Sequence, residues 1–273
     1  MSNDIFLNHT AGEEDARLRR GARARGGLLT LSVDTATEKR SAAVARGGGL
    51  LASCVSELGE GVAAAGILED IDRALREARV RLEEIELFAA ACGPGSFTGL
   101  RSGLSTLKAL AQTLGKPLVG VPTLHALAHA ARPAERLVAL IPAGRGEVFA
   151  QLLGVTVEGV VAESWEPLHV RPARVLEMAG RLGGGIKWAG GGAYKFLELI
   201  REAAEAGGLK FKSAADPTLS PARDEWVLVQ TIDALAADVA SLGQLSYVGG
   251  GRAARADDVK ALYVRPSDAE LKG

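Results

Sequence analysis

The sequence predicts an α/β protein of two related halves, each built in the order β-β-β-α-β-α, and three observations lead to this fold class. A short apolar run at 86–92 leads into a glycine-rich turn, and apolar residues spaced three and four apart follow. This is the pattern of a buried strand that enters an amphipathic helix. Three β-rich runs precede this unit, and a similar succession begins again after residue 117. A repeated α/β unit is the economical interpretation.

Three strands and one helix are predicted ahead of that unit. Residues 28–33 form a β-rich run, and the runs at 41–45 and 50–56 are joined by 46–49, whose three glycines suit a hairpin loop. These strands therefore form an antiparallel meander. Residues 62–79 follow as an amphipathic helix with i,i+4 ion pairs on its polar side. Its apolar side carries Ile67, Leu68, Ile71 and Leu75.

A nine-residue string that joins the apolar run to the next helix is the most informative stretch of the chain. Gly93 and Gly95 can take positive φ angles at no steric cost, and Pro94 between them fixes its own φ. The serine is placed to cap the following helix, because its hydroxyl can accept an N–H of the first turn. We predict a stiff turn and then a helix over 97–115. The string consists of Gly93, Pro94, Gly95, Ser96, Phe97, Thr98, Gly99, Leu100 and Arg101.

The spacing within this string argues against the common glycine-rich active sites. Glycines ahead of a helix can hold a phosphate, but the lysine of a P-loop is missing and no G-x-G-x-x-G is present. Pro94 and Thr98 stand where a serine nucleophile elbow needs glycine. Gly95, Gly99 and Gly103 instead fall four apart, which predicts a helix face that another backbone can approach closely. We favour this structural role.

Strands and helices alternate again in the second half. We predict a strand at 118–121, a short helix at 123–131 and a hairpin of 137–141 with 147–153. Residues 155–170 have no clear pattern.

The remaining chain is predicted to contain three helices and two strands. The helices are expected at 174–182, 194–206 and 224–240, and the strands at 186–189 and 262–266.

These elements divide the chain into two subdomains and two tails. Residues 1–26 are rich in charge and poor in apolar side chains, which is typical of a disordered extension. The N-terminal subdomain is expected over 27–117 and the C-terminal one over 118–266. Residues 267–273 are expected to fray.

Composition narrows the class of protein. The chain has 273 residues, 32 basic and 33 acidic side chains and a net charge of −1, which excludes the basic footprint of an autonomous nucleic-acid binder. Only Cys54 and Cys92 are present, so a reducing cytosol is the simplest setting. No apolar run reaches the roughly 18 residues of a membrane span. A soluble cytoplasmic protein is expected.

Two turns are candidates for nucleotide binding. Asp34 follows the first strand in an Asp-Thr-Ala-Thr turn, where a carboxylate can act through Mg²⁺. Gly190, Gly191 and Gly192 lie between the strand at 186–189 and a helix, and such backbone can lie against a nucleotide. A capped turn and a plain glycine connection would look the same. Together the two turns would bracket a cleft between the halves.

His125 and His129 have the i,i+4 spacing of a zinc-binding pair, but no glutamate stands between them as in H-E-x-x-H. Isolated histidines near a helix end are more often structural. We predict no metal site and no catalytic triad from these residues.

Four segments of the chain resemble the bacterial TsaB (YeaZ) family: 31–37, 93–101, 120–123 and 146–149. The resemblance extends from about Leu28 to Arg265 and is strongest to about residue 153. It implies the ASKHA fold of two subdomains, related to actin, Hsp70 and sugar kinases, which agrees with the order of elements above.

This resemblance implies a role in making N6-threonylcarbamoyl-adenosine next to the anticodon of tRNA. The implied partners are a TsaD-like catalytic paralogue, as a heterodimer, and a TsaE-like ATPase, with tRNA contacted through the complex; self-association of the isolated chain is left open. The metal-binding H-x-x-x-H of TsaD relatives would fall at Thr123 and Leu127. His125 and His129 are two residues out of register, which is roughly 200° around a helix. The resemblance therefore implies no metal and no cofactor.

The chain departs from the family pattern at three places. Pro142 stands where the family often has an acidic residue, the turn at 190–192 lacks an aspartate, and the segment 59–66 lacks a frequent histidine. These changes make nucleotide binding less expected.

The leading hypothesis is a non-catalytic assembly subunit whose helices 62–79 and 97–115 pack against the same pair in the TsaD-like paralogue. A nucleotide-dependent phosphotransferase or ATPase using Asp34 and the Gly190 turn is the alternative, supported mainly by fold analogy. A metallopeptidase, suggested by older glycoprotease names, lacks ligands in register. The expected partner interface comprises Ile67, Ile71, Leu75, Gly99, Gly103, Leu107 and Leu110.

Overall fold

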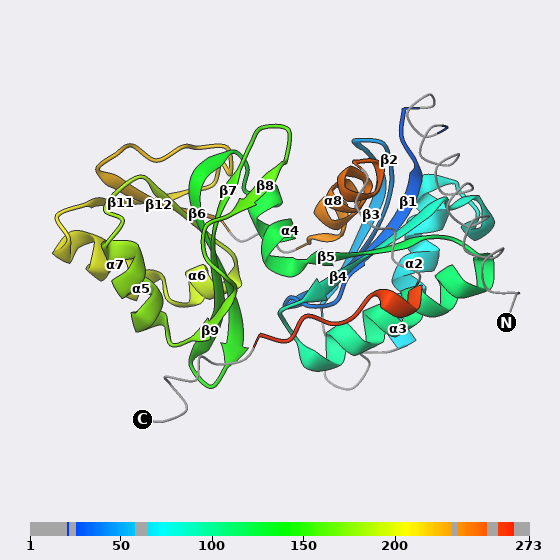
Figure 1. Cartoon of the computed structure of the whole chain (residues 1–273), viewed down its shortest axis with the longest axis horizontal. Helices are drawn as coiled ribbons and strands as arrows, with labels where there is room; N and C mark the ends of the chain where they lie inside the picture. The colour runs from blue at the N-terminus through cyan, green and yellow to red at the C-terminus, as the bar shows by residue number, and fades with distance from the viewer. Residues whose placement is uncertain (1–20, 22–25, 58–64, 231–233, 250–255, 265–273) are drawn as a thin grey trace, which may run out of the picture.

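The computed structural model of the chain describes residues 21, 26–57, 65–230, 234–249 and 256–264. Two sheets lie side by side, each with its own helices, so the molecule is elongated and two-lobed (Figure 1). The first sheet has five strands and the second has seven. The predicted class, a mixed α/β protein with two sheet-based halves, is confirmed.

The first sheet has the order β3-β2-β1-β4-β5. Neighbours β1, β2 and β3 are antiparallel, as the predicted meander requires, whereas β4 pairs in parallel with both β1 and β5. The parallel pairs place the ends of β1 and β4 at the same edge, where the Asp34 turn and the glycine motif begin. The strands are β1 Leu29–Asp34, β2 Lys39–Arg46, β3 Gly49–Glu57, β4 Leu87–Gly93 and β5 Leu118–Pro122.

Helices cover both faces of the first sheet (Figure 1). Side chains alternate along β4, so Phe88, Ala90 and Cys92 enter one core while Leu87 and its alternating neighbours enter another. The helices of the first core are α2 Ala65–Ala78 and α3 Phe97–Leu114, and α8 Ala236–Val248 lies on the opposite face. A short 3-10 turn, η1 Leu82–Glu84, leads into β4, and a second one, η2 Ala256–Asp258, contacts α3.

The second sheet has the order β11-β12-β10-β6-β7-β8, with β9 paired to β7 off this path. Its core includes Trp188 and Trp226, whose ring centroids are 5.0 Å apart. The strands are β6 Ala134–Gly144, β7 Glu147–Val155, β8 Val161–Glu163, β9 Leu168–Val170, β10 Ile186–Ala189, β11 Lys210–Ala214 and β12 Glu225–Val229. The helices are α4 Thr123–Ala130, which joins the halves, α5 Pro172–Gly180, α6 Gly191–Lys195 and α7 Leu197–Ala206.

The helix predicted over 224–240 is wrong in its first part. Residues Glu225–Val229 form β12, a strand whose five residues are all buried between the parallel strands β10 and β11. A short apolar run in the centre of a parallel sheet has no alternation to separate it from a buried helix. The helix begins only at Ala236.

Smaller corrections concern three other segments. The helix predicted over 194–206 is divided into α6 and α7, with Phe196 outside helical geometry at φ −111° and ψ 25°. The strand predicted at 262–266 is absent from the described residues 262–264, where Leu262 N–H only donates to the Cys92 carbonyl at 2.6 Å. The unassigned stretch 155–170 contains β8 and β9.

The boundary predicted at residue 117 differs from the arrangement of the sheets. Strand β5 completes the first sheet, and α8 packs on that sheet although it follows the whole second half in sequence. Ser32 Oγ donates to the Ala236 carbonyl at 2.6 Å, and Ala236 N–H donates to Ser41 Oγ at 3.2 Å. The first half is therefore made of two separated stretches of chain. The predicted tails, 1–26 and 267–273, lie almost wholly outside the described residues.

Within the described ranges, none of the helices is long and apolar enough to cross a membrane.

Candidate functional site

The glycine motif forms the predicted turn between β4 and α3. Gly93 has a φ of 112°, and a Cβ there would lie 2.5 Å from the Leu262 carbonyl oxygen, so glycine is required both for the turn and for space. Ser96 Oγ accepts from Gly99 N–H at 3.2 Å, which confirms the predicted cap. The motif therefore fixes the start of α3 and holds the segment that contains Leu262.

The glycine face of α3 points into the molecule, and this corrects the predicted docking role of Gly99 and Gly103. A Cβ on Gly99 would lie 1.8 Å from the Thr35 carbonyl oxygen, and one on Gly103 would lie 2.2 Å from Thr35 Oγ1. Thr35 Oγ1 donates to the Gly99 carbonyl at 2.8 Å. The backbone that approaches this face is the turn after β1 of the same chain.

The other apolar residues of the predicted interface are also largely internal. Ile67, Ile71, Leu75 and Leu107 are buried in the core between α2, α3 and the first sheet, and Leu110 is partly buried against it. The outward face of α3 is different in character and was not predicted. It carries the small residues Ser102, Ser105, Thr106 and Ala109, of which Ser105 and Ala109 are exposed.

Asp34 lies in the turn that contacts the glycine face of α3. Both of its carboxylate oxygens accept hydrogen bonds from residues of the same turn. One oxygen accepts from Ala36 N–H at 2.8 Å and the other from the Thr37 hydroxyl at 2.6 Å. Burial raises the pKa of Asp34 to about 6, against the opposing effect of these hydrogen bonds. Asp34 thus has the geometry of a capped turn.

The turn at Gly190–Gly192 in the second half lies close to Glu38, the residue that follows the Asp34 turn of the first half. A Cβ on Gly191 would lie 3.7 Å from the Glu38 carboxyl carbon. The flanking glycines have a packing role: Gly190, with φ 99°, and Gly192 would each place a Cβ within 3 Å of Leu140 on β6. Close packing explains the glycines at 190 and 192, and the cleft between the two turns stays a prediction.

The two helix α4 histidines point to different partners. His125 Nε2 lies 2.7 Å from a Glu163 carboxylate oxygen, and burial lowers the pKa of His125 more than Glu163 raises it. His129 Nδ1 lies 2.6 Å from Asp238 Oδ1 on α8 and 2.9 Å from Arg132 Nη1. No cluster of three or more metal-ligating side chains is found in the described part of the chain.

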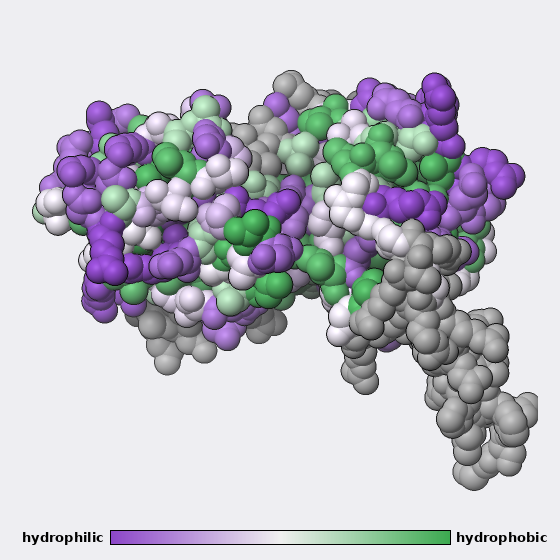
Figure 2. Space-filling view, turned by 90° about the horizontal axis from the view of Figure 1, so that it is seen from above, coloured by the Kyte–Doolittle hydropathy of each residue, from purple (hydrophilic) through white to green (hydrophobic). Residues whose placement is uncertain are grey.

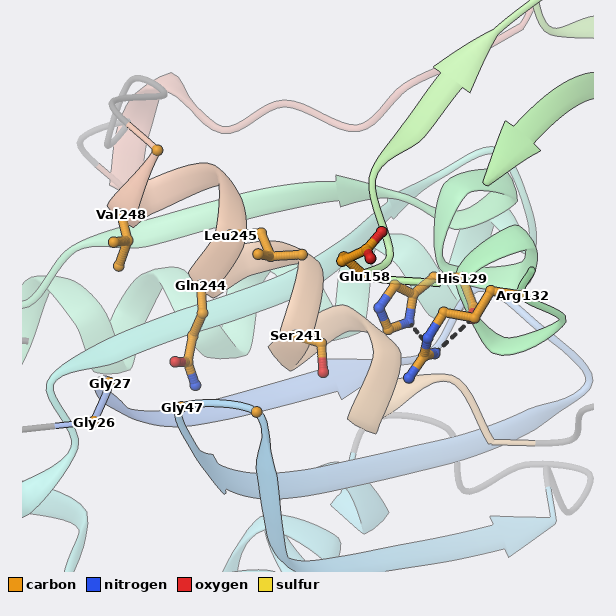
Figure 3. A pocket seen from close by; sticks show the side chains of 12 residues that line it. Gly26, Gly27, Gly47, His129, Arg132, Glu158, Ser241, Gln244, Leu245 and Val248 are labelled. Carbon is orange, nitrogen blue, oxygen red and sulfur yellow. Dashed lines mark hydrogen bonds between the residues drawn. The ribbon is translucent and has the colours of Figure 1, made fainter. Parts of the chain in front are cut away.

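A cavity of about 520 Å³ lies along α8, and sequence reasoning missed it (Figure 3). At one end Arg132 donates to the His129 carbonyl at 2.7 Å and lies 3.6 Å from Asp238, so this cation is already paired. At the other end Gln244 points toward the β2–β3 turn, and its Nε2 finds no acceptor among the residues described. The lining comprises Gly26, Gly27, Gly47, Gly48, His129, Arg132, Glu158, Ser241, Gln244, Leu245, Val248 and Gly249.

No local motif marks this cavity, because its walls come from five separate parts of the chain. Asp238 and Ser241 on α8 would have been informative only together with the position of α8 on the first sheet. Seen from above, hydrophilic side chains cover much of the second half, whereas hydrophobic ones gather over part of the first half (Figure 2). The exposed Leu245 of α8 is one apolar side chain at the cavity wall.

Curated proteins that resemble the chain include members of one system of tRNA modification. The family model for TsaD, tRNA N6-adenosine threonylcarbamoyltransferase, matches residues 64–241, which is more than half of the chain. The chain belongs to this family. Its similarity to TsaB, stated above from the sequence motifs, is confirmed by the relatives and structures that follow.

The TsaB protein of Haemophilus influenzae is 34% identical over 125 residues, which cover 45% of this chain and 52% of that protein. The tRNA N6-adenosine threonylcarbamoyltransferase of Chelativorans sp. is 35% identical over 126 residues, covering 39% of this chain and 35% of that enzyme. The chain thus spans between about a third and a half of the length of these two curated members of the TsaD and TsaB group.

YeaZ from Pseudomonas aeruginosa has the same fold, with a TM-score of 0.66 and 24% identity over 87% of this chain and 100% of YeaZ. A second Pseudomonas aeruginosa structure, described as similar to peptidase YeaZ, has a TM-score of 0.67 at the same identity and coverage. The predicted ASKHA fold of this family is confirmed.

Proposed function

We propose that the chain is a non-catalytic assembly subunit of the complex that forms N6-threonylcarbamoyl-adenosine in tRNA, next to the anticodon. In this role it pairs with a TsaD-like catalytic subunit, works beside a TsaE-like ATPase in the cytoplasm and reaches tRNA through the complex. Family membership supports the system of tRNA modification. The residues at the expected metal positions support the division of labour between subunits.

The structural roles of Thr123 and Leu127 are the main support for a non-catalytic subunit. Thr123 Oγ1 accepts a hydrogen bond from Gly93 N–H at 3.1 Å, and Leu127 is buried in the core and has no ligating atom. Aligned with the metal-binding H-x-x-x-H of the catalytic relatives, these two side chains have structural roles. His125 and His129 are each held by a carboxylate elsewhere.

The outward face of α3 supports a specific docking surface for the catalytic subunit. Small side chains there let a partner helix approach closely. Leu68 on α2 is 54% exposed and adds an apolar contact, and Leu110 on α3 is partly exposed. The proposed interface therefore keeps the helix pair expected from the sequence but uses its solvent side, at Ser102, Ser105, Thr106, Ala109, Leu68 and Leu110.

Ala109→Arg tests this surface, because the exposed Ala109 can change without disturbing the core. Co-purification of the chain with the TsaD-like protein of the same genome should fall about tenfold, since a charged bulky group would enter a closely packed contact. Ala206→Arg, at an exposed position of α7 in the second half, is the matched control and should leave the complex intact. Equal recovery of both variants would contradict the docking surface.

Depletion of the chain tests the function itself. The amount of threonylcarbamoyl-adenosine in bulk tRNA should fall when the chain is removed and recover when it is restored. An Asp34→Asn variant should restore the modification in proportion to the amount of folded variant, as a structural role for this carboxylate requires. Unchanged modification after depletion would refute the proposed function.

A further inference from the structure

Two exposed aromatic rings and an arginine lie together where α3 begins, and no role described above uses them. Phe97 and Tyr263 are 52% and 53% exposed, and their ring centroids are 5.6 Å apart. The Arg101 guanidinium carbon lies 4.0 Å from the centroid of the Phe97 ring. Only one other aromatic side chain in the described part of the chain, Tyr194, is similarly exposed. Exposed aromatic surface is therefore concentrated at this point.

The cluster is held in place by backbone contacts on both sides. Phe97 is the first residue of α3 and follows the Ser96 cap. Tyr263 follows Leu262, which is fixed by its hydrogen bond to the Cys92 carbonyl and by close contact with Gly93. The planar groups are thus presented by an ordered scaffold, which lowers the entropic cost of binding a ligand.

Within the described ranges, no ion pair neutralises the positive charge of this cluster. Arg101 is exposed, and no carboxylate of the described residues pairs with it. Asp257 is held by Gln112 at 2.5 Å, and Gln112 is eleven residues along α3 from Arg101, or about 16 Å at 1.5 Å per residue. That distance exceeds the roughly 8 Å over which charges act at physiological ionic strength. Lys260 is a second exposed cation, three residues before Tyr263.

Aromatic rings beside an unpaired guanidinium suit a nucleotide. Unpaired bases stack on Tyr and Phe rings and on the plane of Arg, while the N–H groups of Arg bind phosphate. We propose that Phe97, Arg101 and Tyr263 form a stacking platform for an unpaired nucleotide of RNA. The proposal rests on the proposed function, in which the RNA is tRNA. The net charge of −1 agrees with a local contact that supplements a larger complex.

Binding of a labelled RNA hairpin with an unpaired loop, followed by fluorescence anisotropy with the full chain, tests this platform. Phe97→Ala and Tyr263→Ala should each weaken binding about tenfold, because a stacking contact is lost. Tyr194→Ala, at the other exposed aromatic, should change binding less than about twofold. A blunt RNA duplex of equal charge should bind more weakly, since its bases are already stacked.

The positive charge of Arg101 and the stacking of its planar guanidinium can be tested separately. Arg101→Ala should weaken binding and reduce the salt slope by about 0.7 for the one phosphate lost. Arg101→Lys should restore the salt slope without restoring full affinity, because an ammonium does not stack as a guanidinium does. Arg201→Ala removes the same charge from α7 at the far end of the molecule and is the matched control (Figure 1). Circular dichroism checks that each variant is folded.

Three outcomes would overturn the platform: no binding of the hairpin, equal binding of hairpin and duplex, or binding unaffected by all three alanine variants. If these variants instead lose only the catalytic subunit in co-purification, the cluster is a protein contact and the RNA proposal is wrong. Failure here leaves the tRNA modification test of depleted cells unchanged, so the two proposals fail separately.

Discussion

At the scale of single residues, the ammonium group of Lys187 joins three segments of the second half. Lys187 is fully buried on β10, and Nζ donates to the carbonyls of Ala131, Pro133 and Pro217 at 3.0, 2.8 and 2.7 Å. Lys187→Met should lower the free energy of unfolding by about 2 kcal/mol, because carbonyl groups lose their donor. Urea denaturation measures this loss, and Lys195→Met, at an exposed lysine, is the control.

The same residue gives the stability a defined dependence on pH. Burial lowers the pKa of Lys187 to about 8, below the roughly 10.4 of an unfolded lysine. Below pH 8 both states hold the proton and the cost of burying the charge is fully present. As the pH rises from about 8 to about 10.4, the folded state has lost the proton and the unfolded state still binds it, so stability rises. Wild type measured against Lys187→Met should show this rise, and parallel curves would contradict it.

At the scale of elements, α3 depends on the absence of side chains at its inner face. Gly99→Ala should destabilise the fold by about 2 kcal/mol or more, because the new Cβ meets the Thr35 carbonyl and backbone must move. Ser105→Ala, on the exposed face of the same helix, should stay within about 0.5 kcal/mol of wild type. Thermal unfolding of both variants gives the comparison, and equal midpoints would show that the turn yields without cost.

Local signals predicted α3 well and its neighbours less well. The cap at Ser96 and the apolar stripe lie within a few residues of one another, so the sequence contains the whole argument for where α3 begins. The contact that explains Gly99 comes from Thr35, 64 positions earlier, and no spacing rule reveals it. The predictions for strand β12 and for the position of α8 were wrong for the same reason. Both depend on which neighbouring elements of the sheet cover an apolar run.

The candidate site also separates what local sequence signals predict from what depends on the tertiary structure. The turn at Gly191 lies close to Glu38, just after the Asp34 turn, because both turns follow strands of related sheets. Their chemistry was not determined by the residue types, since a buried carboxylate satisfied by its own turn looks the same in sequence as a ligand. The cavity at Gln244 and the pairing of Phe97 with Tyr263 required the tertiary structure.

At the scale of the whole molecule, the return of α8 to the first sheet should make the two halves unfold together. All three tryptophans lie in the 118–230 stretch, so their fluorescence reports the second half, whereas far-ultraviolet circular dichroism reports both. The two signals should give one midpoint in urea. In Gly243→Leu, whose Cβ would lie 2.7 Å from that of Ala89, both midpoints should fall equally. A fluorescence midpoint that stayed at the wild-type value would show independent halves.

The separated stretches of the first half have a mechanical consequence. Among the described residues, α4 leads from the first half to the second and α8 packs again on the first half, and the His129–Asp238 pair joins these two helices. Two domains joined by two adjacent connections can bend about the line that passes through both connections. Rotation about any other axis would strain one of the connections. We expect any opening of the molecule to bend about an axis beside this pair, and such bending would change the separation of Glu38 and Gly191.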